Sequence, residues 1–401
     1  MTRKWRIAIV GYGIAGISAA IFLRRLGHKI MHFERAAVPG FSGAGLLLHT
    51  TGLAVLNRLG LGAAAMSRGA VVSRVYGETL CGRKVMDLRY EDHFSGNYGL
   101  GIQRGTLLEL LRGADGHAAL LQTSRQIAAV DAEQGYLFDR DRERLGPFDL
   151  IIAADGANSS IRTGLNALLR HDRPYRWGAV VCLLDDPNDI GGDRVFQSFA
   201  GARHAAIWPV GSHEPGAPRR INVSINVPVV QSEELQDAGT WKRHVAELCP
   251  RIVPLLDQAL GERDLLPFAY RDGALRRYYL GRVALIGDAA HSMSPQLGQG
   301  ASMALLDSWG LANALERNNE MGTALAEFDR ERRIHVSGYQ RISRWITPIF
   351  QSESRMLALL RDRAFYPLSR MPFVKGFMVR MLSGRQQGFF GTTGFGCEDP
   401  Q

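Results

Sequence analysis

The sequence is poor in lysine and yet carries a formal net charge of +9, because it is rich in arginine. The arginines are scattered along the chain rather than massed in one block. Scattered arginine is more typical of a solvated surface than of a stripe that follows nucleic-acid phosphates. We therefore expect the partner to be an anionic small molecule, as substrate or cofactor, and not a nucleic acid. The few lysines are Lys4, Lys29, Lys84, Lys242 and Lys375.

Cysteine is also scarce. The four cysteines lie far apart and include no C-x-x-C pair, which excludes a zinc ribbon or a thioredoxin-type motif. This usage predicts reduced thiols, a cytoplasmic location and no metal site. The four are Cys81, Cys182, Cys249 and Cys397.

Long apolar runs are absent as well. A membrane-spanning helix needs roughly 20 consecutive apolar residues, and no stretch of the sequence provides them. The basic and then apolar residues 1–23 have the outline of a signal peptide. They contain glycines at phosphate-loop spacing, however, and lead into Arg24 and Arg25 without a convincing small-residue cleavage site. We therefore predict no transmembrane segment.

A glycine-rich loop between two apolar strands is the first informative motif. The strand predicted at 6–10 runs directly into GYGIAG, and a helix and a second strand follow, which ends at Glu34. This arrangement is typical of dinucleotide binding. Gly11 permits the tight turn, Gly13 lets a pyrophosphate approach the backbone, and Gly16 lets helix and strand pack closely. Glu34 is expected to accept hydrogen bonds from the adenosine ribose.

Two further apolar strands, predicted at 148–154 and 282–286, end near an aspartate. Asp155 follows the first, and Asp288 follows the second. The carboxyl ends of strands in an open α/β sheet are where ligands bind. Gly298 and Gly300 then open a helix whose bare N–H groups suit an electron-rich acceptor. A carboxylate for a ribityl chain and a helix end for an anionic ring edge favour a flavin, and the alternative is an ordinary strand–loop–helix connection.

Two shorter elements are less specific. The small residues 40–45, which include Gly45, precede a helix predicted at 53–59 and form either a loop beside a flat ring or a plain turn. A second helix is predicted at 102–111, and Arg104 lies at its start. An arginine at this position is usually exposed, so its spacing alone does not identify a ligand contact.

The middle of the chain has a different texture. Strand-like segments separated by Gly, Pro and Asp turns predict a largely antiparallel sheet, joined by strands from 70–99. Residues 343–390 are predicted to be helical and irregular, with alternating apolar and basic residues. They either pack against the body or a partner subunit, which leaves a homodimer open, or touch a membrane surface. The predicted strands are 177–184, 194–199, 205–210 and 221–227.

These patterns predict an α/β fold. It consists of a Rossmann-like dinucleotide-binding domain with an inserted, largely antiparallel substrate domain and a C-terminal helical segment. The predicted boundaries are 1–75, 100–172 and 275–345 for the first domain, 76–99 and 173–274 for the second, and 346–401 for the last segment.

Taken together, the motifs resemble the single-component FAD-dependent aromatic hydroxylases of the p-hydroxybenzoate hydroxylase type. GYGIAG with Glu34 and Arg35, DLIIAADGANSSIR and GRVALIGDAAHSMSPQLGQGASMALLDS occur in that family's order and at similar spacing, up to about residue 345. One departure is Ser302, where many members have asparagine. The motifs and the resemblance predict FAD binding by Gly11, Gly13, Ile14, Ala15, Gly16, Glu34, Arg35, Gly45, Arg104, Asp155, Gly156, Asp288, Gly298, Gly300 and Ala301.

The chemistry that the resemblance implies belongs largely to the cofactor. NADH or NADPH reduces the flavin, O2 adds at its C4a carbon, and the resulting hydroperoxide hydroxylates an aromatic or polycyclic small molecule. Pro295 is expected beside the flavin ring, and His291 is a candidate catalytic residue with a structural alternative. Four side chains of the inserted sheet are weaker substrate-binding candidates, namely Tyr76, Gln197, Arg203 and His204.

Other activities on the same fold remain open. A flavin-dependent halogenase is disfavoured because Trp208-Pro209 stands alone, without the W-x-W-x-I-P signature of those enzymes. A prenyl-chain reductase would need a lipid tunnel, which sequence does not reveal. A flavoprotein that only binds other proteins is the remaining alternative.

Overall fold

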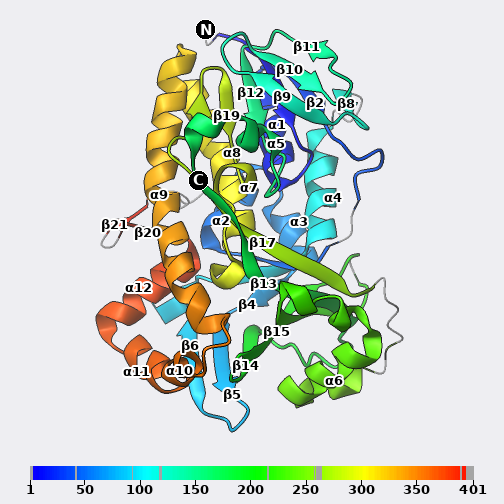
Figure 1. The fold of residues 1–401 in the computed structure, drawn as a ribbon, viewed down its shortest axis with the longest axis vertical. Coiled ribbons are helices and arrows are strands. Elements are labelled where there is room, and N and C mark those ends of the chain that lie inside the picture. The colour runs from blue at the N-terminus through cyan, green and yellow to red at the C-terminus, as the bar shows by residue number, and fades with distance from the viewer. Residues whose placement is uncertain are drawn as a thin grey trace.

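A computed structural model describes residues 3–40, 43–92, 94–116, 120–214, 216–256, 258, 264–388 and 391–393. Residues 41 and 42 of the predicted 40–45 loop, Cys397 and the end of the C-terminal segment lie outside the described residues. Two large sheets dominate the molecule, one in the upper half of Figure 1 and one in the lower half. Helix α9 (Met321–Phe350) runs along one side of both.

The upper sheet has the strand order β18-β19-β12-β1-β2-β8. Its strands are parallel apart from the β18–β19 pair. β1 and β12 are short and almost wholly buried, as expected for central strands of a parallel sheet covered on both faces. The strands are β1 (Arg6–Val10), β2 (Lys29–Phe33), β8 (Leu121–Gln122), β12 (Leu150–Ala153), β18 (Tyr279–Leu280) and β19 (Val283–Leu285).

Helices α1 and α8 pack against each other beside this sheet. The Ser18 hydroxyl donates to the Ser308 hydroxyl at 2.8 Å between them, and α1 also packs on α4. The helices of this half are α1 (Ile14–Arg25), α2 (Thr50–Arg58), α3 (Gly62–Arg68), α4 (Arg104–Asp115), α5 (Ser160–Gly164), α7 (Asp288–His291) and α8 (Gly300–Arg317).

The lower sheet has seven strands in the order β17-β13-β16-β15-β14-β5-β6, and only the β14–β5 pair is parallel. α6 (Ala238–Leu248) covers one of its faces and buries Trp241 there. We call this the outer face and the opposite one the inner face. The strands are β5 (Arg74–Thr79), β6 (Lys84–Arg89), β13 (Leu169–Asp185), β14 (Arg194–Ala200), β15 (Arg203–Gly211), β16 (Arg220–Pro228) and β17 (Leu266–Leu275).

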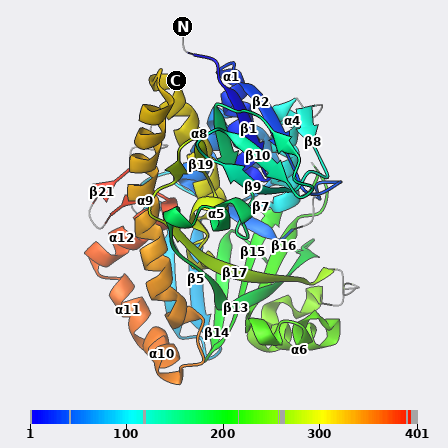
Figure 2. The same ribbon diagram turned by 45° about the horizontal axis from the view of Figure 1, so that its top comes forward.

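Small sheets and C-terminal helices complete the fold. A three-stranded sheet of β3 (Gly45–Leu48), β7 (Gly99–Gln103) and β4 (Ala70–Val72) lies against β15. A second one contains β9 (Ile127–Asp131), β10 (Tyr136–Asp139) and β11 (Arg144–Leu145), and β20 (Gln386–Gln387) pairs with β21 (Gly391–Thr392). Three helices labelled at the lower left of Figure 2 follow α9, namely α10 (Arg355–Leu360), α11 (Tyr366–Ser369) and α12 (Pro372–Ser383).

The architecture confirms the predicted α/β class with an inserted, largely antiparallel sheet and a C-terminal helical segment. One element was predicted wrongly, because the apolar residues before Arg104 form strand β7 and the helix begins only at Arg104. Short apolar runs do not distinguish a buried strand from a helix. The domain boundaries stay a prediction. None of the described helices is long and apolar enough to cross a membrane.

Candidate FAD and substrate site

Three ligand-binding segments meet at one edge of the parallel sheet. β1, β12 and β19 are neighbours in register, so their carboxyl ends point the same way. The glycine loop at Gly11 follows β1, Asp155 follows β12, and Asp288 follows β19. This is the edge at which open α/β sheets bind ligands.

The glycine loop needs two of its glycines for steric reasons. Gly11 has a φ of +104°, and a Cβ there would lie 2.3 Å from the Ala154 carbonyl oxygen. A Cβ on Gly16 would lie 2.0 Å from the Gly11 carbonyl oxygen. The space beside Gly13 is open, and no side chain caps α1, which starts at the next residue. The first-turn N–H groups of α1 are therefore available to a phosphate.

Glu34 lies beside this loop at the end of β2. One carboxylate oxygen accepts from the Tyr12 N–H at 2.9 Å, and the other accepts from the Ala36 N–H at 2.9 Å. Each oxygen keeps a further lone pair for a ligand hydroxyl. Arg35, the next predicted residue, is exposed.

Asp155, Asp288 and Arg104 form the polar part of the site. The Asp288 side chain reaches solvent, but protein atoms surround it closely enough to raise the pKa of its carboxyl group. The carboxylate therefore lies in a recess that is open to solvent. Burial lowers the pKa of Arg104, and the nearby Asp288 charge opposes that shift. Burial also raises the pKa of Asp155, whose buried Oδ1 atom has no partner in the part of the chain that the structure describes. A buried polar atom without a partner is typical of a ligand-binding position.

The start of α8 is a second helix end without a side-chain cap. Gln299 occupies the N-cap, but its side-chain amide donates to the carbonyl oxygens of Met381 and Leu382, at 2.9 and 3.0 Å. No acidic residue lies in the first turn, which begins at Gly300 and Ala301. The positive end of α8 thus remains available to an anionic ligand group.

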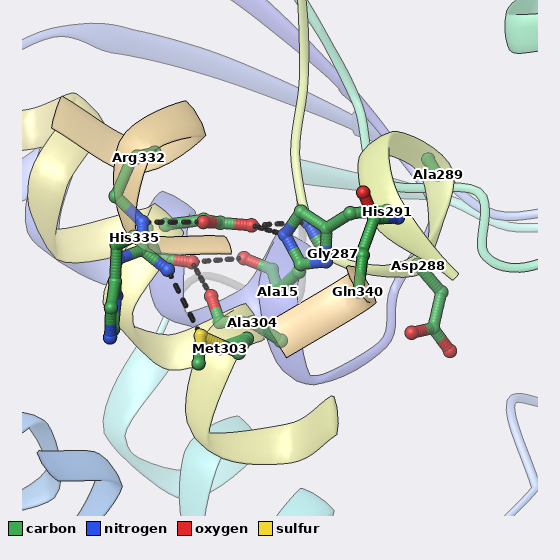
Figure 3. A network of polar contacts seen from close by, with 12 residues as sticks. Ala15, Gly287, Asp288, Ala289, His291, Met303, Ala304, Arg332, His335 and Gln340 are labelled. Atoms are coloured by element: carbon green, nitrogen blue, oxygen red, sulfur yellow. Dashed lines mark hydrogen bonds and ion pairs between the residues drawn. The ribbon is translucent and has the colours of Figure 1, made fainter. Parts of the chain in front are cut away.

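His291 is part of a buried polar network behind the site. Its Nε2 lies 2.6 Å from Asp307 Oδ2, which also accepts from the Gly287 N–H at 2.7 Å. Asp307 Oδ1 accepts from Arg332 Nε at 2.7 Å. Figure 3 shows His291 turned toward this network and Asp288 turned away from it. The ring of His291 thus contacts Asp307 and does not face the recess, which favours a positioning role, and a catalytic role stays a prediction.

The electrostatics of this network explain its stability. Burial alone would raise the pKa of Asp307, but the His291 and Arg332 charges outweigh it and lower that pKa. The Arg332 guanidinium also lies 2.6 Å from His335 Nδ1, and His335 Nε2 lies 2.9 Å from the Gly384 carbonyl oxygen. Burial, with the Arg332 charge, lowers the pKa of His335 to about 3. His335 is therefore neutral at ordinary pH.

The segments between the two sheets are closely packed. Gly45 lies in β3, where its N–H donates to Asn222 Oδ1 at 2.6 Å and a Cβ would collide with Val210. The Ser302 hydroxyl accepts from the His49 N–H at 3.1 Å, which ties the end of β3 to α8. Gly298 has a φ of +63°, and Pro295 begins the short 3-10 helix η8 (Pro295–Leu297) before it. A contact of Pro295 with the flavin stays a prediction.

The four substrate candidates divide between the faces of the lower sheet. Gln197 and His204 lie on the inner face, whereas Tyr76 and Arg203 lie on the outer face. Tyr76 stacks on Phe196, and Arg203 pairs with Glu247 of α6 at 2.6 Å. Tyr76 and Arg203 are thus not brought together with the other two, so the structure favours only Gln197 and His204 among the predicted substrate contacts.

The inner face carries further polar residues that the sequence prediction missed. Trp208, Asn222 and Asn226 project from it, and Asn226 Nδ2 lies 2.7 Å from His204 Nδ1. The sequence signal that could have found the polar residues of β16 is their alternation, since Asn222, Ser224 and Asn226 alternate with buried apolar residues. Four buried polar atoms on this face have no partner among the described residues, namely Gln197 Oε1, His204 Nε2, Trp208 Nε1 and Asn222 Nδ2.

The register leaves room above the middle of the inner face. Gln197 lies opposite Ala206, and Ala206 lies opposite Ser224. These small side chains remain partly accessible to solvent although they lie in the centre of a sheet. Larger side chains lie on either side of them along the strands, namely the pair of His204 with Asn226 and the pair of Trp208 with Asn222.

The residues fit FAD. An uncapped helix behind a glycine loop suits a pyrophosphate, Glu34 suits a ribose, recessed Asp288 suits a ribityl chain, and the α8 end suits an anionic ring edge. No group of three or more metal-binding side chains occurs in the described part of the chain.

Comparison with known proteins agrees with this geometry. The model of the FAD binding domain family matches residues 4–339. The chain is 27% identical over 366 residues to a putative 2-heptyl-3-hydroxy-4(1H)-quinolone synthase of Rhodococcus erythropolis, which covers 89% of this chain and 91% of that protein. It is 27% identical over 369 residues to the 6-hydroxynicotinate 3-monooxygenase of Bordetella bronchiseptica, with 86% and 91% covered.

A solved structure shares the fold. Klebsiella pneumoniae HpxO, complexed with FAD and uric acid, matches with a TM-score of 0.79 at 21% identity, over 94% of this chain and 97% of that one. Several relatives are named as hydroxylases or monooxygenases, so this chain is an enzyme of that kind. Because the family model covers most of its length, the chain belongs to the FAD-binding family of aromatic hydroxylases and monooxygenases.

Proposed function

We propose that the protein is an NAD(P)H-dependent FAD monooxygenase that uses O2 to hydroxylate an uncharged heteroaromatic small molecule. The observation that carries the proposal is the convergence of the glycine loop, Asp155, Asp288 and the uncapped start of α8 at one sheet edge, next to the inner face. When bound, the flavin supplies the reduction and oxygen chemistry that no side chain of this site provides.

The protein's own part is to bind, orient and stabilise. Glu34 and the start of α1 hold the adenosine and pyrophosphate, and Asp288 accepts from the ribityl hydroxyls. The start of α8 stabilises negative charge on the ring edge, since preorganised N–H groups act strongly where water is excluded. Asp307 and His291 keep the Asp288 loop in place from behind.

The substrate class follows from the inner face. The side chains in the middle of its strands are uncharged, and burial, with the Arg361 charge, lowers the pKa of His204 to about 3, so His204 is neutral. Arg361 lies beside this face, but its charge is matched by Asp362 at 2.8 Å. A carboxylate would lie here without a cation, which is costly. A ring that offers both an N–H and a carbonyl would satisfy Gln197 Oε1 and the Trp208 and Asn222 donors.

The relatives support a heteroaromatic ring. The two names describe a quinolone and a hydroxynicotinate, which differ in that only the second carries a carboxylate. The uncharged inner face favours the first kind of ring.

The cofactor and the reductant are tested together. Purified protein should show a flavin absorbance spectrum and release FAD on denaturation, and stopped-flow mixing with NADH or NADPH should bleach it. A bound flavin that neither nicotinamide reduces would point to a halogenase or a reductase with a separate electron donor. A protein that cannot be reconstituted with FAD would refute the proposal.

The substrate class is tested by comparing 4-hydroxyquinoline with 6-hydroxynicotinate for accelerated NAD(P)H oxidation and formation of a hydroxylated product. We expect turnover with the first. Gln197→Leu should raise its KM roughly ten- to hundredfold, because a buried hydrogen bond to the ring is lost. Arg203→Ala, on the outer face, is the matched control and should leave KM unchanged. A preference for the carboxylate would refute the substrate class but not the cofactor assignment.

A further inference from the structure

The C-terminal helices expose an unusual apolar surface. Residues 355–369 are helical throughout, and Met356, Leu359 and Leu360 lie at i, i+3 and i+4 on one side. These side chains are 74%, 50% and 56% exposed. The surface continues through Leu368, Met371 and Phe373 at the start of α12. We call this set of six side chains the apolar face.

The opposite side of the same helix fixes it to the body. Arg361 is buried, its guanidinium lies 4.3 Å from the centre of the Phe199 ring, and it donates to the Gly201 carbonyl oxygen at 3.0 Å. Ala358 is buried on that side too. A helix at the surface of a soluble body normally turns charged side chains outward. In this helix the side that packs on the body is formed by Ala358 and Arg361, and the apolar face points away from the body into solvent.

Arginines surround the apolar face. Arg355, Arg363 and Arg370 are exposed within the segment, and Arg363 follows Met356 by seven residues on the same side of the helix. None of the three forms an ion pair among the described residues. The sequence of residues 355–373 contains one acidic residue, Asp362, and it forms an ion pair with Arg361. Asp87 and Asp92 line the same recess as Arg370, so the positive charge around the apolar face is carried by Arg355 and Arg363. The surface is therefore both apolar and positive.

Charge decides which partner fits. A second copy bound across a two-fold axis would place the same arginines near each other, without acids to match them. A bilayer with anionic headgroups matches both features, since apolar side chains enter the interface and arginines meet the phosphates. We propose that this face docks the enzyme on an anionic phospholipid membrane.

Docking would bring the bilayer close to the substrate sheet. Phe365 of the same helical run contacts Phe350 at 5.4 Å between ring centres, and Phe350 contacts Phe199 at 5.7 Å. Phe199 stacks on His204 of the inner face at 4.5 Å. The docked face would therefore lie only three ring contacts away from the inner face. The docking itself does not depend on the proposed substrate.

The test is sedimentation of the full FAD-loaded protein with vesicles of phosphatidylcholine alone or of phosphatidylcholine mixed with phosphatidylglycerol. We expect binding to the mixed vesicles that weakens as salt rises. Leu360→Asp should weaken binding about tenfold or more, because an apolar anchor is lost and a like charge is introduced. Arg363→Glu should weaken binding to the mixed vesicles. Val230→Asp, at an apolar side chain that is 90% exposed elsewhere, should not alter binding.

Flavin absorbance and circular dichroism keep folding separate from docking, and both should be unchanged in these variants. Failure to sediment with the mixed vesicles would overturn the proposal. So would equal binding by Leu360→Asp and the parent protein. If light scattering shows that Leu360→Asp converts a dimer into a monomer while vesicle binding persists, a second copy covers the face and membrane docking is refuted.

Discussion

Replacement of Asp307 by asparagine tests whether the buried network positions the flavin site. Arg332 is fully buried, and its Nε donates to Asp307 at 2.7 Å. The asparagine removes the carboxylate that accepts from Arg332 and so removes a negative charge from beside a buried guanidinium. Breaking a buried pair in this way costs about 3–5 kcal/mol of the free energy of unfolding. The variant should also bind FAD more weakly, because the Gly287 N–H and His291 lose their acceptor.

The measurement is urea unfolding followed by fluorescence, together with the FAD content after gel filtration. Asp329→Asn is a suitable control, because Asp329 also accepts from a backbone N–H, that of Tyr278 at 2.8 Å. Its ion-pair partner Arg333 is 42% exposed and stays hydrated when the charge is removed. The control should lose only about 1 kcal/mol and keep its FAD.

A second variant isolates the charge from the hydrogen bonds. Combining Asp307→Asn with Arg332→Met removes the buried cation together with its carboxylate, so the double variant should recover part of the lost stability. Equal losses for Asp307→Asn and Asp329→Asn would refute the reasoning. A double variant less stable than Asp307→Asn alone would also refute it.

Three other predictions concern the cofactor and pH. Asp288→Ala should lower FAD retention, and an unchanged flavin-to-protein ratio would contradict its ribityl contact. Glu34→Ala should weaken FAD binding in a titration of the apoprotein while FMN binding stays the same, since FMN lacks the adenosine that Glu34 contacts; equal weakening of both would remove that assignment. Burial lowers the pKa of His204 and His335 from 6.5 to about 3. Above pH 6.5 neither state of the protein binds these protons, whereas between 6.5 and 3 only the unfolded state does. The contribution of these two histidines to stability should therefore be constant above pH 6.5 and fall below it, by up to about 1.4 kcal/mol per pH unit for each histidine. The urea midpoint measured from pH 7.5 to 5 checks this, and a His335→Gln variant should show a shallower fall.

The ligand edge of the fold was predictable because its signals are local. A glycine loop after an apolar strand, and an aspartate after each of two others, are each contained in about ten residues. Parallel strands then bring these ends together. The strands of the inserted sheet were also predictable from turn residues and alternation.

The direction of side chains in the inserted sheet was not predictable from one strand alone. Tyr76 and Arg203 lie on strands of the same sheet as Gln197 and His204, but α6 covers the face to which they belong. Which face α6 covers is a tertiary fact. The direction of the His291 ring was not predictable for a similar reason, because its partner Asp307 lies on another helix and no local pattern links the two.

The C-terminal segment contacts the residue that precedes α8, the helix whose start we propose for the flavin. Gln299 precedes α8 in the position from which a side chain could cap the helix, yet its amide binds the carbonyl oxygens of Met381 and Leu382. The helix start is thereby left open to a ligand and is held in place by residues about eighty positions away in the chain. His335 adds a second tie to the same region through the Gly384 carbonyl oxygen. A chain that ends before α10 would lose all three acceptors, so it should bind FAD weakly even though every sequence motif for FAD remains in it.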